Sequence, residues 1–501
     1  MTNCFDAVVV GGGLGGLAAA AALARAGRSV RLLERHVQPG GYATTFTRGP
    51  FEFEASLHEL SGIGTPQAPG PLYRTLERLD VAKRLTFLPI PDLYRAVAPR
   101  YGLDMRLPAS RQGATEALLD AFPHERAGIT RVMDDLFAIE RDVDRLSDGV
   151  DLSTPEVIAR YPAFARAARS PLAALLYREV GDPLARLALG QMWSYFGLPP
   201  SRLSLLLFAS GLTTYLSHGA CTIKGKSQAL SNALVAVIED AGGVVTLGDG
   251  AREIACSSNR VSGVITDHGE QLQTETVVAN ANPLIVAFDL VGPDRFPAAF
   301  IRRISRCAPS ISTVCVHLGL SNDRRALGLD DHEVFINGTV DLEQQYRDAC
   351  QLEPSDSFLL TAYNVVDADF SPQGTCVVSL VAACDGRAWS KLDSAGYRAL
   401  KRRYAEQLVA RAAELYPGLE HHIDVEVIST PITNTRYTGN IAGAIYGFAP
   451  TPDENPAFRL PQRAPIDGLW FAGAWTQPGG GYQPSIESGV AAADAVLTSR
   501  S

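Results

Sequence analysis

The sequence predicts a two-part α/β and α+β fold: a discontinuous parallel sheet with helices, and an inserted domain of mixed sheet and helices. The N-terminus provides the first observation. A β-branched run at residues 7–10 leads through glycines into an alanine-rich helical pattern at 17–26, and a second strand follows at 29–33. This strand–helix–strand order predicts parallel strands joined by a right-handed crossover.

Two later stretches have the same character and provide the second and third observations. A helical pattern at 227–241 ends at a glycine pair and precedes a strand at 244–247, and a strand at 469–472 precedes a helix at 486–497. Turn residues also bound expected strands at 254–256, 261–266 and 276–279.

The intervening segments have a different pattern. Helical periodicity with charged faces dominates 116–186, whereas 310–320, 357–364 and 375–383 read as strands of an antiparallel sheet, followed by a helix at 394–415. A chain of 501 residues is also too long for one simple core. We therefore expect a nucleotide-binding domain from residues 1–85, 219–290 and 425–501, and a substrate-binding domain from residues 86–218 and 291–424.

Composition excludes several classes of protein. A net charge of −9 gives no basic footprint for nucleic acid, and eight scattered cysteines show no metal-ligand spacing, which predicts free thiols and no metal site. The N-terminus lacks the basic region of a signal peptide. The uncharged stretches 187–201 and 203–217 are each shorter than the roughly 20 residues of a spanning helix. We expect a cytoplasmic protein, with peripheral membrane contact left open.

The glycines after the first strand form a dinucleotide-binding motif. Gly11, Gly13 and Gly16 give G-x-G-x-x-G, in which the first permits a tight turn, the second admits a pyrophosphate and the third lets helix and strand pack. Glu34 ends the second strand, where a carboxylate accepts ribose hydroxyls and argues against NADP. The motif predicts a Rossmann-like site but does not separate NAD from FAD.

Two further glycine clusters favour FAD. Gly40 and Gly41 stand just beyond Glu34, where backbone free of side chains can approach an elongated diphosphate and ribityl chain. Near the C-terminus, Gly473 ends a strand, and a triple glycine leads to Pro484 and Ser485 at a helix start. A helix N-terminus aimed at the flavin would stabilise negative charge on the reduced ring.

These segments together resemble the phytoene desaturase, carotenoid isomerase and retinol saturase group of FAD-dependent oxidoreductases, within the amine-oxidase-like FAD superfamily. Beyond the glycine motifs, the resembling stretches are "QPGGYATTF", "FEFEASLHELSG", "VVANANP" and "TPITNTRYTGNIAGAIYG". In that group a glycine commonly stands where Ser56 stands here. The resemblance implies two-electron chemistry at flavin N5 on a long, apolar, conjugated substrate such as a carotenoid.

The motifs and the resemblance give a set of expected cofactor-binding residues: Gly11, Gly13, Leu14, Gly16, Glu34, Arg35, Gly40, Gly41, Leu57, His58, Gly473, Ala474, Gln483, Pro484 and Ser485. If a proton moves, the candidates are His58, Glu59, Tyr446 and Arg436, each with a structural role as its alternative. Trp475 and Gln477 are expected near the flavin ring, and His421 and His422 on the surface.

The stretch 187–215 is uncharged apart from Arg202, and two readings of it remain open. Its large side chains line a substrate tunnel, or they belong to an ordinary pair of buried helices: Met192, Trp193, Tyr195, Phe196, Phe208 and Tyr215.

Several functions remain open at this point. The leading one is hydride transfer at C–C bonds of a polyene, by desaturation, saturation or isomerisation. The alternatives are a tailoring oxidoreductase or cyclase of a polyene polyketide, which an Ala- and Arg-rich, bacterial-looking sequence permits, an amine oxidase, and a flavin-stabilised binding module without turnover. The expected partner is an apolar small molecule. No second dinucleotide motif is present, so the electron donor or acceptor stays open.

Overall fold

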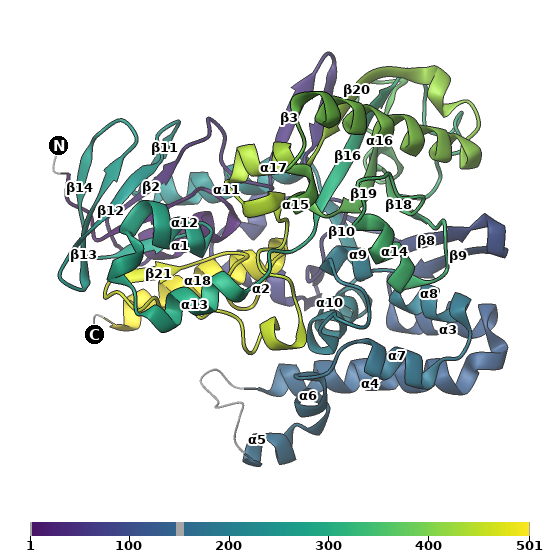
Figure 1. The fold of residues 1–501 in the computed structure, drawn as a ribbon, viewed down its shortest axis with the longest axis horizontal. Helices are drawn as coiled ribbons and strands as arrows, with labels where there is room; N and C mark the ends of the chain where they lie inside the picture. The colour runs from purple at the N-terminus through teal and green to yellow at the C-terminus, as the bar shows by residue number, and fades with distance from the viewer. Residues whose placement is uncertain (1–2, 147–154, 500–501) are drawn as a thin grey trace.

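The chain folds around two sheets of different kinds. The computed structural model describes residues 3–146 and 155–499. Figure 1 shows the parallel sheet with both chain ends on the left, a larger mixed sheet at the upper right, and a group of helices below the mixed sheet. Among the residues so described, no helix combines the length and apolar character needed to cross a bilayer.

The first sheet has five parallel strands in the order β11-β2-β1-β15-β21. Its strands are β1 (Ala7–Val10), β2 (Val30–Glu34), β11 (Val244–Leu247), β15 (Val277–Ala279) and β21 (Leu469–Phe471). They come from the three separated parts of the chain that the sequence predicted. The central strands β1 and β15 are buried throughout, as parallel strands covered on both faces are.

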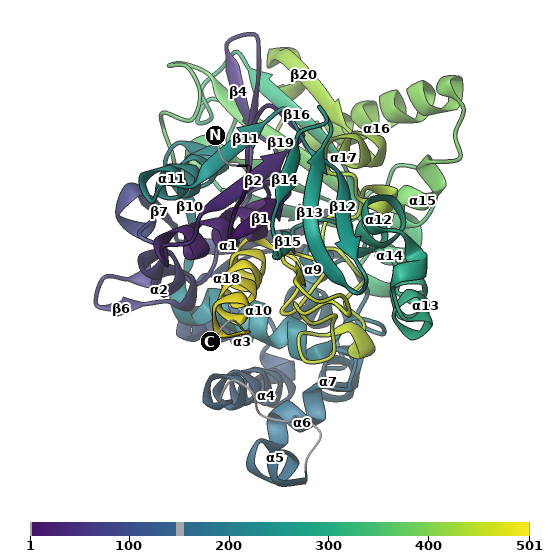
Figure 2. The same cartoon turned by 90° about the vertical axis from the view of Figure 1, so that its left-hand side faces the viewer.

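Three helices pack together on one side of this sheet. They are α1 (Leu14–Arg25), α11 (Lys226–Asp240) and α18 (Tyr482–Ser499), and α1 contacts both of the others. Figure 2 shows α18, from the end of the chain, lying beside α1, from its beginning. A Cβ at Gly489 would overlap the Gly15 carbonyl oxygen, so the absence of a side chain allows this close contact.

The second sheet has seven strands in the order β20-β16-β19-β18-β17-β8-β9. The predicted strands are confirmed as β16 (Ser312–Leu320), β18 (Phe358–Ala362) and β19 (Cys376–Cys384), and they pair antiparallel. The sheet as a whole is mixed, because β17 (Glu333–Ile336) pairs parallel with β8 (Asp92–Ala98). The edge strands are β9 (Leu103–Pro108) and β20 (Ile423–Ser429). The long helix α16 (Ser394–Leu415) spans the predicted range.

Several small sheets and hairpins accompany the two large sheets. They are β3 (Thr45–Arg48) with β4 (Phe51–Glu54), β5 (Gly64–Thr65) with β6 (Ala68–Pro69), β7 (Phe87–Ile90) with β10 (Ala220–Ile223), and β12 (Ala251–Ser257), β13 (Arg260–Thr266) and β14 (Gln271–Gln273). The β3–β4 hairpin reaches the mixed sheet, where the Phe46 ring lies edge-on to His317 of β16 with 5.1 Å between centroids.

The predicted helical region forms a bundle that shares one hydrophobic core with strands of the mixed sheet. It contains α3 (Arg111–Ala121), α4 (Arg126–Arg145), α5 (Pro155–Arg160), α6 (Pro162–Ala167), α7 (Ala173–Glu179), α8 (Pro183–Gly190), α9 (Trp193–Phe196) and α10 (Leu205–His218). The remaining α-helices of the described residues are α2 (Pro71–Arg78), α12 (Pro283–Ile285), α13 (Ala298–Arg306), α14 (Leu342–Ala349), α15 (Gly386–Trp389) and α17 (Pro431–Thr438). The domain boundaries given above stay a prediction.

Candidate FAD and substrate site

One cavity of about 1010 Å³ is lined by residues of both the parallel-sheet part and the mixed-sheet part of the molecule. Its lining includes the turn after β1, the segment after β2, the start of α18, and side chains from α9, α10 and the mixed sheet. Carboxyl ends of parallel strands are the usual position for ligands in open α/β folds. The cofactor and substrate residues predicted from the sequence are therefore expected to line this one cavity.

The glycine turn after β1 packs around a single side chain, Asn280, which follows β15. A Cβ at Gly13 would lie 2.6 Å from Asn280 Nδ2, and a Cβ at Gly473 would overlap Asn280 Oδ1. Asn280 Nδ2 also donates to the Gly11 carbonyl at 3.5 Å. Asn280 lines the cavity but was not among the expected site residues. Its position directly after a buried strand is the signal that could have identified it.

The second glycine pair lies against the first turn, as the FAD interpretation requires. Gly40 N–H donates to the Gly12 carbonyl at 2.7 Å, and a Cβ at Gly40 would overlap the Ala43 carbonyl oxygen. Gly40 and Gly41 both have positive φ, a conformation that glycine adopts without strain. Backbone without side chains thus lines the cavity in two segments, the turn after β1 and the Gly40–Gly41 pair.

Glu34 is fixed at the end of β2 by two backbone donors. Its Oε2 accepts from Gly12 N–H at 2.6 Å and its Oε1 from His36 N–H at 2.8 Å, and its side chain lines the cavity beside Arg35. A held carboxylate at this position suits the adenosine ribose of a dinucleotide.

The C-terminal segment reaches the same cavity. Gly480, Gly481, Gln483, Pro484 and Ser485 all line it together with Gly11, Gly13 and Leu14. The helix begins at Tyr482, slightly earlier than the predicted start at Pro484 and Ser485. Its first turn lines the cavity, and the positive end of a helix would suit the negative charge of a reduced flavin bound there.

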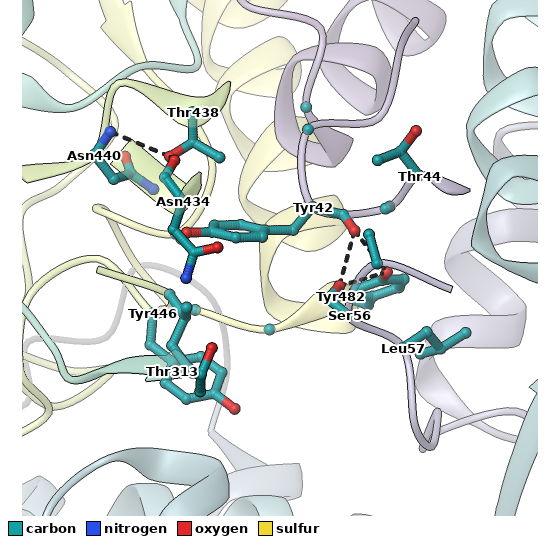
Figure 3. Close-up of a pocket in the computed structure, with 18 of the residues that line it drawn as sticks. Tyr42, Thr44, Ser56, Leu57, Thr313, Asn434, Thr438, Asn440, Tyr446 and Tyr482 are labelled. Carbon is teal, nitrogen blue, oxygen red and sulfur yellow. Dashed lines mark hydrogen bonds between the residues drawn. The ribbon is translucent and has the colours of Figure 1, made fainter. Parts of the chain in front are cut away.

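Ser56, the departure from the resembling group, has a defined structural role. Its hydroxyl donates to the Tyr42 carbonyl at 2.8 Å and lies 3.0 Å from the Tyr482 hydroxyl, which reaches the same carbonyl at 3.3 Å. Figure 3 shows these three residues joined on one side of the cavity, with Tyr446 and Thr313 grouped apart from them. The serine thus ties the start of α18 to the Gly40–Gly41 segment.

The expected cofactor residues divide into two groups. Most line the cavity: Gly11, Gly13, Leu14, Glu34, Arg35, Gly40, Gly41, Leu57, His58, Ala474, Gln483, Pro484 and Ser485. Gly16 and Gly473 are not part of the lining. A Cβ at Gly16 would overlap the Gly11 carbonyl oxygen, so Gly16 lets α1 pack against β1, and Gly473 makes room for Asn280.

His58 lines the cavity and is held by hydroxyl groups of Thr361 on β18 and of Tyr363 just after that strand. Its Nδ1 lies 2.8 Å from Thr361 Oγ1 and 3.2 Å from the Tyr363 hydroxyl. Burial, followed by the neighbouring His332 and His317, lowers the pKa of His58 to about 3. The imidazole is therefore neutral at neutral pH and is not available as a cationic general acid.

The other proton-transfer candidates differ in position. Tyr446 and Glu59 line the cavity, and burial raises the pKa of the Tyr446 hydroxyl, which keeps its proton. The prediction that Arg436 takes part in proton transfer is corrected. Arg436 is exposed on α17 and is not part of the lining, so its guanidinium does not face the cavity.

The positions of the remaining candidates are mixed. Trp475 lines the cavity and donates from Nε1 to Asn440 Oδ1 at 3.2 Å, whereas Gln477 lies outside the lining and donates to the Ala457 carbonyl. His421 is exposed and His422 half-buried. All eight cysteines are unpaired.

Both readings of the uncharged stretch apply, each to different residues. Trp193, Tyr195, Phe196 and Tyr215 line the cavity, whereas Met192 and Phe208 pack in the helical core. Helical periodicity alone does not predict which face of a buried helix lines a cavity and which packs in the core.

Comparisons with known proteins agree with this geometry. The model of the family "Flavin containing amine oxidoreductase" matches residues 14–497. The chain is 28% identical to a phytoene dehydrogenase of Streptomyces griseus, over 98% of this chain and 95% of that protein. It is 22% identical to the all-trans-retinol 13,14-reductase of Rattus norvegicus, over 88% of this chain and 77% of that protein.

Another relative is the chloroplastic prolycopene isomerase 2 of an Oncidium hybrid cultivar, 25% identical over 98% of this chain and 84% of that protein. Among solved structures, an oxidoreductase from Methanosarcina mazei superposes with a TM-score of 0.65 at 16% identity, over 98% of this chain and 99% of that one. Putrescine oxidase bound to putrescine superposes with a TM-score of 0.64 at 16% identity, over 99% of each chain. These two show the shared fold.

The cavity fits an elongated flavin dinucleotide at its glycine turn, at its ribose carboxylate and at the start of α18, and the family model spans nearly the whole chain. The chain belongs to the flavin-containing amine oxidoreductase family, and its cofactor is FAD.

Proposed function

We propose that this FAD-dependent oxidoreductase transfers a hydride at C–C bonds of a long, apolar, conjugated polyene. The observation that carries the proposal is the continuity of the cavity, which runs from the glycine cradle to large aromatic side chains of α9, α10 and β17. The relatives named for phytoene, prolycopene and retinol support it, because all three names refer to polyenes.

The residues around the cavity have defined parts in such a reaction. FAD, when bound, supplies the hydride acceptor or donor. Trp193, Tyr195 and Phe196 exclude water and give an apolar wall against which a flat polyene can lie. Tyr446 and the neutral His58 keep the wall uncharged at neutral pH, which suits a substrate without charge.

The test uses purified protein carrying its flavin. Oxygen-free mixing of the oxidised form with phytoene, and of the reduced form with retinol and lycopene, should bleach or restore the visible flavin band with at least one of these polyenes. Chromatography of the polyene then separates desaturation, saturation and isomerisation. A flavin that none of these polyenes oxidises or reduces, with each polyene recovered unchanged, would overturn the proposal.

Two other readings give distinct results in the same experiment. Rapid flavin reduction by putrescine would identify an amine oxidase. Turnover of a polyene acyl chain, but of no carotenoid, to a product with new rings would identify a tailoring cyclase.

A further inference from the structure

A chain of hydrogen bonds leads from the cavity wall to a buried carboxyl group. His58 Nδ1 lies 2.8 Å from Thr361 Oγ1, and the same oxygen lies 2.7 Å from Glu333 Oε2. Glu333 on β17 and Thr361 on β18 are direct cross-strand partners, both buried and outside the cavity lining, whereas His58 is half-buried and part of the lining. The three side chains therefore connect the cavity with the interior of the mixed sheet.

The second nitrogen of the imidazole is open to the cavity. His58 Nε2 makes no hydrogen bond within the described part of the chain. It is not one of the fully enclosed polar atoms without a partner, in contrast to both carboxyl oxygens of Glu59. His58 thus has one nitrogen that a ligand can reach and one that is bonded to Thr361.

The Thr361 hydroxyl carries one proton, so the chain has two arrangements. When Glu333 is ionised, Thr361 donates to Glu333, His58 donates from Nδ1–H to Thr361, and Nε2 is an acceptor. When Glu333 carries a proton, it donates to Thr361, Thr361 donates to His58 Nδ1, and Nε2–H is a donor. The same two hydrogen bonds serve both arrangements, because only protons change place.

We infer that His58, Thr361 and Glu333 form a proton relay that serves the substrate carbon next to the one exchanging hydride with FAD. In desaturation the C–H bond of that carbon breaks, and its electron pair becomes the second bond of the new C=C as hydride leaves the neighbouring carbon for FAD. The proton goes to His58 Nε2, the Nδ1 proton to Thr361 and the Thr361 proton to Glu333. Saturation reverses each transfer. The inference rests on the proposed function and adds the residues that handle its proton.

Burial explains why a relay is needed in place of a single base. Burial, followed by the neighbouring His332 and His317, lowers the pKa of His58, so an imidazolium ion is unfavourable here. In the relay His58 is neutral before and after the transfer, because one nitrogen gains a proton as the other loses one. The cavity wall therefore exchanges a proton without acquiring a charge.

Glu333 is suited to the buried end of the relay. Burial raises its pKa, so it holds a proton more firmly than an exposed carboxyl group does. Hydrogen bonds from Thr361 and from the Tyr195 hydroxyl favour ionisation of Glu333, and Glu59 beside it has no such donors, so Glu333 loses its proton before Glu59. The other titratable groups that interact with Glu333 have pKa values raised chiefly by burial and are neutral: Tyr195, Tyr215 and Tyr363.

The first experiment follows the His58 tautomer by nitrogen NMR of flavin-loaded protein with isotope-labelled histidine, with the His58 signals assigned from their absence in His58→Gln. As the pH rises from about 6 to about 10, the wild type is expected to change from Nε2–H to Nδ1–H without an imidazolium signal, because Glu333 loses its proton. Glu333→Gln removes the titrating group and should keep one tautomer throughout. Thr213→Val is the matched control and should show the wild-type change, because it removes a buried hydroxyl on α10 that donates to a backbone carbonyl.

The second experiment measures the transfer itself. In oxygen-free mixing with phytoene, retinol and lycopene, Thr361→Val should slow the change of the flavin band at least about 100-fold, the order that positioned proton transfer contributes. Thr361→Ser restores the hydroxyl and should stay within about tenfold of the wild type. Because Thr361 is outside the lining, both variants should bind the polyene as the wild type does, measured by quenching of the fluorescence of Trp193 and Trp475.

The outcomes separate the relay from the proposed function. A His58 tautomer that does not change with pH in the wild type, or that changes equally in Glu333→Gln, overturns the relay whatever the polyenes do. Wild-type rates in Thr361→Val overturn it and leave the proposed function standing, and so does equal slowing in Thr361→Val and Thr361→Ser. If no polyene changes the flavin, the proposed function is removed together with the relay's part in it.

Discussion

At the scale of single residues, burial sets the charge of the acids that hold the site together. Glu54 ends β4, is 2% exposed, and its carboxyl accepts from Ser227 N–H at 2.8 Å and from the Ser227 hydroxyl at the start of α11. Burial raises the pKa of Glu54 to about 7 from its ordinary value of 4.5. The folded protein therefore holds a proton on Glu54 that the unfolded chain releases in mildly acidic solution.

This shift predicts a pH dependence of stability. A carboxyl group with a raised pKa contributes stability that is complete below about pH 4.5 and is lost as the pH rises through about 7, because the folded state binds more protons in that window. The unfolding free energy of the wild type relative to Glu54→Gln should fall by about 3 kcal/mol from pH 4.5 to pH 8. Denaturant titrations of both proteins across this range measure the difference, and a constant difference would contradict the prediction.

At the scale of elements, the contact between the first and last helices positions the cofactor site. Gly489 of α18 lies against the Gly15 carbonyl of α1, so the first turn of α18 is held where Gln483, Pro484 and Ser485 reach the cavity. The sequence of either helix taken alone does not predict this contact, because the two helices come from opposite ends of the chain. Most of the stability of such a helix comes from its packing in the protein.

Gly489→Ala tests this contact. The added methyl group would push α18 away from α1 and should lower the unfolding free energy by about 1–3 kcal/mol, together with the affinity for FAD. Calorimetry and flavin titration measure the two effects. Ala491→Ser, exposed on the same helix, should change stability by less than about 0.5 kcal/mol. Full flavin affinity in Gly489→Ala would show that the contact does not position the site.

At the scale of the whole molecule, one cavity is built from residues near both ends and the middle of the chain. A ligand that fills it must stabilise all of these parts together, because it binds only when they are assembled. Added FAD should therefore raise the unfolding free energy of flavin-depleted protein with concentration, by about 4 kcal/mol at a thousandfold excess over Kd.

Calorimetry with increasing FAD measures this stabilisation, and riboflavin, which lacks the diphosphate and adenosine, should stabilise much less. Hydrogen exchange of the backbone amides shows which segments of the chain FAD contacts. FAD should protect the backbone amides at 11–16 and 40–42, and those of Tyr482, Gln483 and Ser485, in parallel. Protection confined to one of these segments would contradict a single cofactor spanning them.

The sequence was sufficient for the cofactor cradle because each part of it depends on local chemistry. Gly13 and Gly40 lie in turns that follow predicted strands, and Glu34 ends the second of these strands. A side chain at either glycine would meet protein atoms at once. The strand and helix order likewise predicted the three-part parallel sheet. It did not predict β17 or β8, because a short buried strand such as β17 has no periodicity that separates it from other apolar runs.

What only the tertiary structure decided is which distant side chains meet. Thr361 and His58 are 303 positions apart in the chain, yet their side chains lie 2.8 Å from each other. The same folding brings Glu59 beside Glu333 and leaves Arg436 exposed. Such contacts depend on how strands from different parts of the chain pair and pack, and no local pattern encodes them. The sequence alone therefore determined that the protein carries a dinucleotide, and the fold decided which acids and aromatic rings surround the space beside it.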